Sequence, residues 1–202
     1  MDKEVQKALR HLAKTDPMMK KIIGKAGVIK MEPTDDYFAC IVNNIICQLI
    51  STKAADTISG RLIDYTLGEI KPAILVDISL AQYRIFGIGK QKAGYIIGLA
   101  AAFIENADDF ATLHLQSDKE VIKSLTQIRG IGKWTAEMFL IFGLARMDVF
   151  SPDDLALRNA MIKYFGMPAD SKRSAFTKNA EVWAPYRSVA SILLWRSLSV
   201  MD

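Results

Sequence analysis

The 202-residue sequence predicts an all-α protein, and three observations carry this prediction. Apolar residues recur at helical rather than alternating spacing, as in Ile41, Ile45 and Leu49. Turn-forming residues gather between these periodic segments, and no stretch shows the alternation typical of a strand. Half of the residues are hydrophobic, which is enough to form a core. We therefore expect one compact domain or two small helical lobes.

Ten segments have helical periodicity, and each ends where turn formers or glycines interrupt it. In chain order they cover residues 3–14, 17–26, 35–50, 53–67, 89–105, 118–126, 133–144, 153–164, 172–181 and 186–198. Four clusters of turn formers predict loops, at Thr15-Asp16-Pro17, Glu32-Pro33-Thr34, Asn106-Ala107-Asp108 and Phe165-Gly166-Met167-Pro168. Glycine turns at 87–89 and 130–132 precede the helices expected at 89–105 and 133–144. A Ser-Pro-Asp-Asp segment at 151–154 begins the helix expected at 153–164.

The net charge and the N-terminal sequence limit the class of protein. A charge of +4 suits a polyanionic partner, although so mild an excess does not identify one. The N-terminus lacks the apolar segment of a signal peptide, and no apolar run is long enough to span a bilayer. We therefore expect a soluble monomer without a membrane partner, cytoplasmic in a bacterium (cytosol or nucleoid) or nuclear in a eukaryote.

The two cysteines are expected to be core thiols. Cys40 and Cys47 are seven residues apart on the third expected helix, about 10 Å along its axis, which is too far for a disulfide. Two cysteines cannot supply the four thiolates of an iron–sulfur cluster. We expect that the protein requires no cofactor.

The most informative motif is a glycine hairpin centred on Gly130 and Gly132. Because glycine lacks a side chain, this turn can adopt positive φ and bring backbone N–H groups to an anion at the start of the next helix. The motif fits a clamp for a DNA phosphate, and the alternative is an ordinary glycine turn between packed helices. A weaker copy lies at 87–93, where Lys90 and Lys92 either contact a second phosphate or are solvated residues of an ordinary helix entry.

A carboxylate pair follows the hairpin, in the segment Ser151-Pro152-Asp153-Asp154. These carboxylates either take part in chemistry or only cap a helix, because Ser and Asp accept backbone N–H bonds at that position. Both functions are compatible. In that case Asp153 is expected to be the cap, while the helix N-terminus favours an ionised Asp154.

Five segments in this order resemble the helix-hairpin-helix DNA glycosylases, and within them the 3-methyladenine DNA glycosylase II family. They are 48–51, 86–93, the hairpin at 128–136, 148–154, and 183–188 with Trp195. The resemblance implies two helical lobes around a central cleft, a middle lobe of about 36–120 and a terminal lobe of 1–35 plus 121–202. It also implies base excision repair of duplex DNA, by hydrolysis of the N-glycosidic bond of alkylated purines such as 3-methyladenine and 7-methylguanine.

Two alternatives remain open. The first is a glycosylase of the same family that removes deaminated or oxidised bases. The second is a non-catalytic helix-hairpin-helix protein that binds damaged DNA, although a simple backbone binder requires neither Asp154 nor paired tryptophans.

The resemblance assigns the reaction type through the residue after Gly-Ile-Gly-Lys. Bifunctional relatives have a lysine nucleophile there, which forms a Schiff base and cuts the strand. This chain has Trp134, and Lys133 is one position too early, about 100° away around the helix. The resemblance therefore implies a monofunctional hydrolase, in which Asp154 stabilises the positive charge that develops on the sugar.

The resemblance also implies a base pocket. Trp134 and Trp195 match pocket positions, where indole faces stack on an extruded base and favour cationic rings, and the alternative is that both are core aromatics. Gln48 matches a polar pocket residue, with a helix-to-helix hydrogen bond as the alternative. Met138 and Leu155 replace aromatic pocket residues of the family, so the pocket is expected to be less aromatic.

The remaining assignments concern DNA and an ion. Leu49 matches the side chain that is inserted into the duplex in place of the flipped nucleotide, and the alternative is a core leucine. The DNA backbone is expected to contact the hairpin residues Arg129, Gly130, Ile131, Gly132, Lys133 and Thr135. A structural Na⁺ or K⁺ is expected on the backbone carbonyls of Thr126, Ile128 and Ile131.

Overall fold

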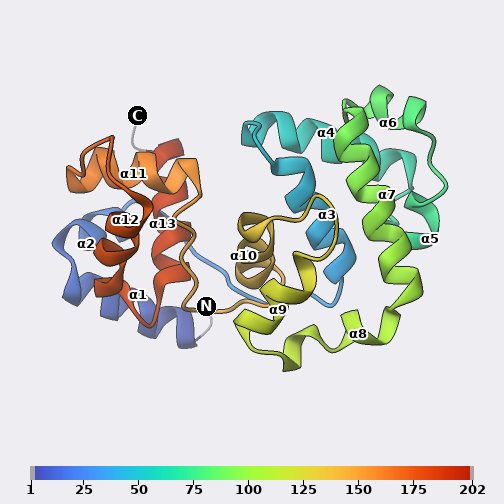
Figure 1. Ribbon diagram of the computed structural model, residues 1–202. Helices are drawn as coiled ribbons and strands as arrows, with labels where there is room; N and C mark the ends of the chain where they lie inside the picture. Colours follow the sequence, from blue (N-terminus) through green and yellow to red (C-terminus); the bar gives the residue numbers. More distant parts are fainter. Residues whose placement is uncertain (1–2, 201–202) are drawn as a thin grey trace. The chain divides into compact units, whose positions relative to one another are not determined.

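The computed structural model describes residues 3–200, and all regular structure within that range is helical (Figure 1). The α-helices are α1 (Lys3–Thr15), α2 (Pro17–Ile23), α3 (Tyr37–Cys47), α4 (Thr52–Tyr65), α5 (Pro72–Leu75), α6 (Leu80–Phe86), α7 (Lys90–Glu105), α8 (Ala107–Ala111), α9 (Asp118–Leu125), α10 (Lys133–Phe142), α11 (Leu155–Phe165), α12 (Arg173–Asn179) and α13 (Arg187–Val200). Two short 3₁₀ helices are η1 (Leu113–Leu115) and η2 (Ala180–Trp183). The all-α prediction is confirmed.

The chain divides into two compact units. The middle unit is Thr34–Leu144, and the terminal unit contains the chain up to Pro33 and from Ala145 onward. The first boundary agrees with the predicted one to within two residues. The second was expected near residue 120 but lies after Leu144, because α10 packs against both α3 and α9 and so joins the hairpin to the middle unit.

The middle unit is built around α3. Its apolar residues are buried against α4, α7 and α10, and they include Phe38, Ile41, Val42, Ile45 and Ile46. Asp36 begins the helix, because its carboxylate accepts the Ala39 amide at 2.9 Å. The long helix α7 also packs against α5, α6 and α8 (Figure 1). This core fixes the ends of α3 and α10, which carry the predicted DNA-binding residues.

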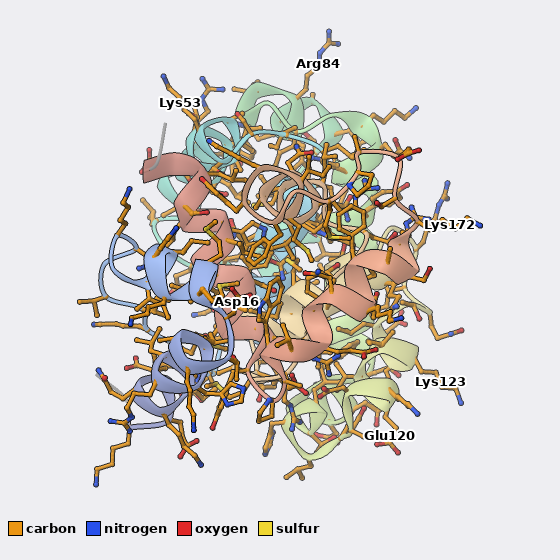
Figure 2. The ribbon with its side chains drawn as sticks, turned by 90° about the vertical axis from the view of Figure 1, so that its left-hand side faces the viewer. Asp16, Lys53, Arg84, Glu120, Lys123 and Lys172 are labelled. Atoms are coloured by element: carbon orange, nitrogen blue, oxygen red, sulfur yellow. The ribbon has the colours of Figure 1, made fainter. Side chains whose placement is uncertain are left out.

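The terminal unit joins the first two helices to the last one. Both α1 and α2 pack against α13, and α11 packs against α13 as well. Asp16 lies at the start of α2 (Figure 2). Its carboxylate accepts the amides of Met18 and Met19 at 2.8 and 3.1 Å and the indole N–H of the buried Trp183 at 2.9 Å. This buried carboxylate therefore connects segments that are 167 residues apart in the chain.

The ten predicted helices are all present, and the structure contains three further short α-helices that were not predicted. These are α5, α6 and α8, which have four to seven residues and are too short for helical periodicity to be recognised. The expected loop at 106–108 is wrong, because Asn106 alone separates α7 from α8. The third helix ends at Cys47 rather than near residue 50, because the backbone leaves the helical conformation at Gln48, with ψ 123°, and Leu49 then has positive φ. No helix among the described residues is long and apolar enough to cross a membrane.

Candidate functional site

The hairpin lies between α9 and α10, in the middle unit. Gly130 has φ +94°, a conformation that disfavours any side chain. A Cβ atom at this position would also lie 2.0 Å from Cγ of the Tyr95 ring, so the ring packs directly on the glycine backbone. Ile131, the next residue, is buried and anchors the turn to the core. The fold therefore requires glycine at 130 for two reasons, the positive φ and the close contact with the Tyr95 ring.

The hairpin presents the start of α10 without a side-chain cap. Gly132 is the N-cap residue and has no side chain to cap this ten-residue helix, so no N-cap side chain covers its first backbone amides. Such amides, together with the positive end of the helix dipole, attract a phosphate group. Arg129 and Lys133 are exposed beside the turn, and Lys133 Nζ lies 3.5 Å from the buried carboxylate of Glu137. The geometry fits the predicted phosphate clamp.

Gln48 connects the hairpin to the end of α3. Its side-chain amide donates to the Gly130 carbonyl at 3.0 Å and to Thr135 Oγ1 at 2.9 Å. Thr135 is only 2 % exposed and its hydroxyl accepts from Gln48, so its contact with DNA stays a prediction. Gln48 was predicted either to line the base pocket or to form a helix-to-helix hydrogen bond. The structure shows hydrogen bonds from Gln48, to the hairpin at Gly130 and to Thr135 on α10.

Lys92 holds the same end of α3 from the other side. Its Nζ donates to the carbonyls of Ile46 and Gln48 at 2.8 and 2.6 Å. A cation at these carbonyls satisfies acceptors that a helix C-terminus leaves open and opposes the negative end of its dipole. Burial lowers the pKa of Lys92. Lys92 is therefore not the solvated lysine that one of the two predictions described.

Leu49 follows Gln48 and has two unusual properties. Its φ is +56°, a left-handed conformation that is uncommon for leucine, and its side chain is 103 % exposed. The alternative that Leu49 is a core leucine is therefore wrong. Ser51 begins α4 two residues later, because its hydroxyl accepts the Ala54 amide. The loop from Gln48 to Ile50 thus projects an apolar side chain between two fixed helix ends.

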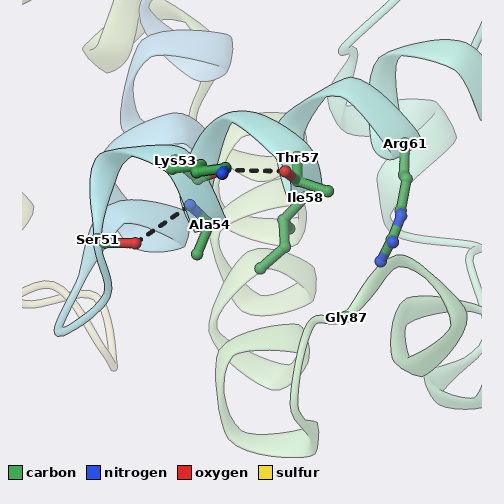
Figure 3. Close-up of a pocket in the computed structure, with 7 residues that line it drawn as sticks. All are labelled: Ser51, Lys53, Ala54, Thr57, Ile58, Arg61 and Gly87. Atoms are coloured by element: carbon green, nitrogen blue, oxygen red, sulfur yellow. Dashed lines mark hydrogen bonds between the residues drawn. The ribbon is translucent and has the colours of Figure 1, made fainter.

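The turn before α7 repeats the hairpin conformation. Both turns contain Gly-Ile-Gly-Lys, and Gly87 has φ +96°, close to the value at Gly130. Gly89, like Gly132, is an N-cap residue without a capping side chain. Ile58 and Gly87 line two pockets, and Arg61, which lines one of them, extends from α4 toward Gly87 (Figure 3). The second phosphate contact stays a prediction for this turn.

Asp154 caps α11, in the terminal unit. Its Oδ1 accepts the backbone amide of Leu157 at 2.7 Å and the indole N–H of Trp195 at 3.0 Å, and the residue is 8 % exposed. The expectation that Asp153 is the cap is wrong, because Asp153 forms an ion pair with Arg173 instead. Both donors bind the same oxygen of the Asp154 carboxylate. Its orientation is therefore fixed by a helix and by a tryptophan.

The remaining predicted pocket residues are divided between the units. Trp134 is half-buried and Met138 is buried on α10 of the middle unit. Trp195 is half-buried on α13, and Leu155 is exposed at the start of α11, both in the terminal unit. Of the predicted pocket, the structure therefore brings Trp195 together with Asp154 through a hydrogen bond. The two pockets at Gly87 include none of these residues.

The proposed ion ligands lie in the hairpin. The Ile128 carbonyl already accepts the amide of Ile131 at 3.1 Å, which leaves one lone pair of that oxygen. Thr126 ends α9 as its C-cap residue, where carbonyl oxygens lack helical partners. Carbonyl oxygens suit a hard monovalent cation, so the three residues fit the predicted ion. Among residues 3–200, no group of three or more His, Cys, Asp or Glu side chains is placed to hold a metal.

Two contacts at this site had little signal in the sequence. Tyr95 packs on Gly130 from a helix 35 residues away, which no local pattern reveals. Lys92 was recognised as part of the repeated turn, but its partners on α3 depend on how α7 packs.

The fold and these residues define a helix-hairpin-helix protein, and comparisons with known proteins place it in a family. Residues 42–185 match the family described as HhH-GPD superfamily base excision DNA repair protein, and the chain belongs to this family. The DNA-3-methyladenine glycosylase of Saccharomyces cerevisiae is 30 % identical, over 95 % of this chain and 79 % of that protein. DNA-3-methyladenine glycosylase 1 of Schizosaccharomyces pombe is also 30 % identical, over 97 % and 89 %.

A solved structure is similar over nearly the whole chain. It is the Schizosaccharomyces pombe 3-methyladenine DNA glycosylase (Mag1) in complex with abasic DNA, with a TM-score of 0.85 and 29 % identity. The match covers 96 % of this chain and 97 % of that one. The predicted family, fold class and class of enzyme, a DNA glycosylase, are confirmed by these comparisons.

Proposed function

We propose that this protein is a monofunctional DNA glycosylase that removes alkylated purines, of the 3-methyladenine and 7-methylguanine type, from duplex DNA in base excision repair. The observation that carries the proposal is the fixed carboxylate of Asp154, held by the α11 N-terminus and by Trp195. The names of two relatives and of one similar solved structure, all 3-methyladenine DNA glycosylases, support this substrate class.

Asp154 is proposed to act electrostatically. Breaking the N-glycosidic bond develops positive charge on the sugar, and a preorganised carboxylate near that charge lowers the barrier. The same group can also orient the attacking water. Because Asp154 Oδ1 already accepts two hydrogen bonds, the carboxylate does not have to reorganise during the reaction.

Trp134 is proposed to make the reaction hydrolytic rather than strand-cutting. It occupies the second position of α10, where a lysine would be needed to form a Schiff base. Lys133 is engaged with Glu137 and exposed beside the hairpin, which suits a phosphate contact. The product is therefore a free base and an intact strand with an abasic site.

The alkylated substrate is proposed on the chemistry of the tryptophans. N-alkylation makes a purine electron-poor or cationic and weakens its glycosidic bond, so stacking on indole faces favours it without a strong general acid. Trp195 binds Asp154 directly, which keeps an indole ring next to the catalytic carboxylate. Trp134 is half-buried and provides a second indole on the other unit.

The decisive experiment compares two neighbouring aspartates. Asp154→Asn keeps a side chain that caps helices but removes the charge, so the protein should fold and lose activity. We expect single-turnover release of 3-methyladenine from methylated duplex DNA to fall by about 10²–10³-fold, the range for loss of one preorganised electrostatic group. Asp153→Asn is the matched control and should retain near-normal activity, because Asp153 pairs with Arg173. Equal rates for Asp154→Asn and the parent protein would refute the assignment.

We also propose a structural Na⁺ or K⁺ on the carbonyls of Thr126, Ile128 and Ile131, where it would help to hold a DNA phosphate. Replacing both ions by tetramethylammonium at constant ionic strength should weaken binding to an abasic-site duplex. Circular dichroism should show an unchanged helix content in the same buffers. Equal affinity in all three salts would remove the ion from the proposal.

A further inference from the structure

The loop that carries Leu49 is held by two side chains from elsewhere in the middle unit. Gln48 binds the hairpin at the Gly130 carbonyl and Thr135 Oγ1. Lys92 binds the Ile46 and Gln48 carbonyls from α7. The four bonds have lengths of 2.6 to 3.0 Å, and they surround the residue immediately before Leu49.

The position of Leu49 is energetically unfavourable in the free protein. A left-handed conformation is unfavourable for a residue with a side chain, and full exposure gives up the burial that leucine could gain. Leu67 has the same two properties, with φ +53° and 90 % exposure, where α4 ends. The feature that distinguishes Leu49 is the pair of clamps at Gln48, so these clamps and not the leucine alone require an explanation.

We infer that Gln48 and Lys92 are positioning residues that hold Leu49 ready for insertion into the duplex at a fixed place relative to the phosphate-binding hairpin. The inference rests on the proposed function, because it deepens the role of Leu49 in extruding a nucleotide. Gln48 fixes the loop to the hairpin backbone, and Lys92 fixes the peptide bond before Leu49 to α7. Hydrogen bonds of Gln48 and Lys92 thereby connect the hairpin that binds the DNA backbone with the loop that inserts Leu49.

The contacts of Lys92 separate this role from a phosphate contact. A lysine that neutralises a phosphate in the complex contributes to the salt dependence of binding. Lys92 Nζ is already within 2.8 Å of two carbonyl oxygens and only partly accessible, so its contribution to that salt dependence should be absent. The two roles therefore predict different results for the same variant.

The test is a double-mutant cycle between Lys92→Met and Leu49→Ala. Insertion is followed by the fluorescence of 2-aminopurine placed opposite a tetrahydrofuran abasic-site analogue, and base release is measured in single turnover on methylated duplex. Binding to undamaged duplex is measured over a range of salt concentrations. Gln48→Met removes the other clamp and should reduce the fluorescence change and base release in the same way as Lys92→Met. Lys92→Arg keeps a cationic donor and should retain most of both signals.

Two matched controls come from the same unit. Leu67→Ala removes another exposed leucine with positive φ, and Lys71→Met removes an exposed lysine that pairs with Glu69 at the surface. Both should leave the fluorescence change and the base release unchanged. Urea unfolding and circular dichroism establish that each variant is folded before it is compared.

We expect Lys92→Met to lower the rate of base release about tenfold to a hundredfold, the range for a lost hydrogen bond to a charged group, and Leu49→Ala to lower it at least as much. The double variant should be no slower than the slower single variant, because Lys92 acts only through Leu49 and has nothing to position once the leucine is removed. The salt slope on undamaged DNA should be the same for Lys92→Met and the parent protein. Multiplying effects in the double variant, or a shallower salt slope for Lys92→Met, would overturn the inference.

Failure of the inference can be told from failure of the proposed function. Loss of base release by the parent protein from every alkylated substrate would refute the glycosylase proposal, whatever the variants do. Normal release by the parent protein together with unchanged release and fluorescence in Lys92→Met and Gln48→Met would refute the positioning role alone. Unchanged fluorescence in Leu49→Ala would refute insertion of Leu49 and, with it, the role of both positioning residues.

Discussion

Gly130→Ala is the substitution whose cost the structure allows us to work out most fully. The added methyl group meets two obstacles. The residue keeps φ +94°, which costs a non-glycine residue about 1–2 kcal/mol. The new Cβ also lies 2.0 Å from Cγ of Tyr95, so the ring must shift by more than an ångström, and overpacking of this kind costs about 1–3 kcal/mol. The sum is about 2–5 kcal/mol of unfolding free energy.

The assay is equilibrium urea unfolding of four proteins: the parent, Gly130→Ala, Tyr95→Ala and the double variant. In the Tyr95→Ala background the steric contribution disappears, so Gly130→Ala should cost only the conformational part, about 1–2 kcal/mol. Gly132→Ala is the control, because its φ is −90° and no atom lies within 4 Å of the new Cβ. Its cost should stay below about 1 kcal/mol. The reasoning fails if Gly130→Ala costs the same in both backgrounds, or no more than Gly132→Ala.

Two further predictions concern the hairpin and the thiols. The binding constant for DNA should fall less steeply with salt when Arg129→Ala and Lys133→Ala are combined. The slope of log binding constant against log salt should become smaller in magnitude by about 2, because two phosphate contacts are lost. An unchanged slope would contradict both contacts. Burial raises the pKa of Cys40 to about 12 and also raises that of Cys47, so iodoacetamide should alkylate both far more slowly at pH 8 in the native protein than in urea. Equal alkylation rates in the native protein and in urea would contradict the burial of these thiols. The unfolded thiol of Cys40 loses its proton near pH 9 while the folded one keeps it, so the free energy of unfolding should fall as pH rises above 9.

The sequence predicted the parts of the fold that depend on local patterns. Helical periodicity identified every long helix, and two glycines with a following helix identified the hairpin. The resemblance added the family, and it selected Asp154 rather than Asp153 as the functional aspartate. The choice of the cap was nevertheless wrong, because neighbouring aspartates have the same local propensity and the pairing of Asp153 with Arg173 is a tertiary contact.

The contacts that fix the site depend on packing between distant segments. Gln48 was assigned to a pocket by its position, but its amide binds residues 82 and 87 positions later in the chain. Lys92 reads in sequence as a helix-entry lysine, and only the packing of α7 beside α3 brings it to the C-terminal carbonyls of α3. The boundary at Leu144 has the same origin, since α10 joins the middle unit by packing on α3.

The order of the two units along the chain has a consequence for synthesis on the ribosome. Helices α1 and α2 emerge first, but their packing partner α13 is made last, so they must wait through the translation of the whole middle unit. Thr34–Leu144 contains all the segments of its own compact unit and can acquire its tertiary structure while the rest is still being made. The nascent chain should therefore expose the apolar faces of its first two helices for longest, which makes them the segment that depends most on protection by chaperones.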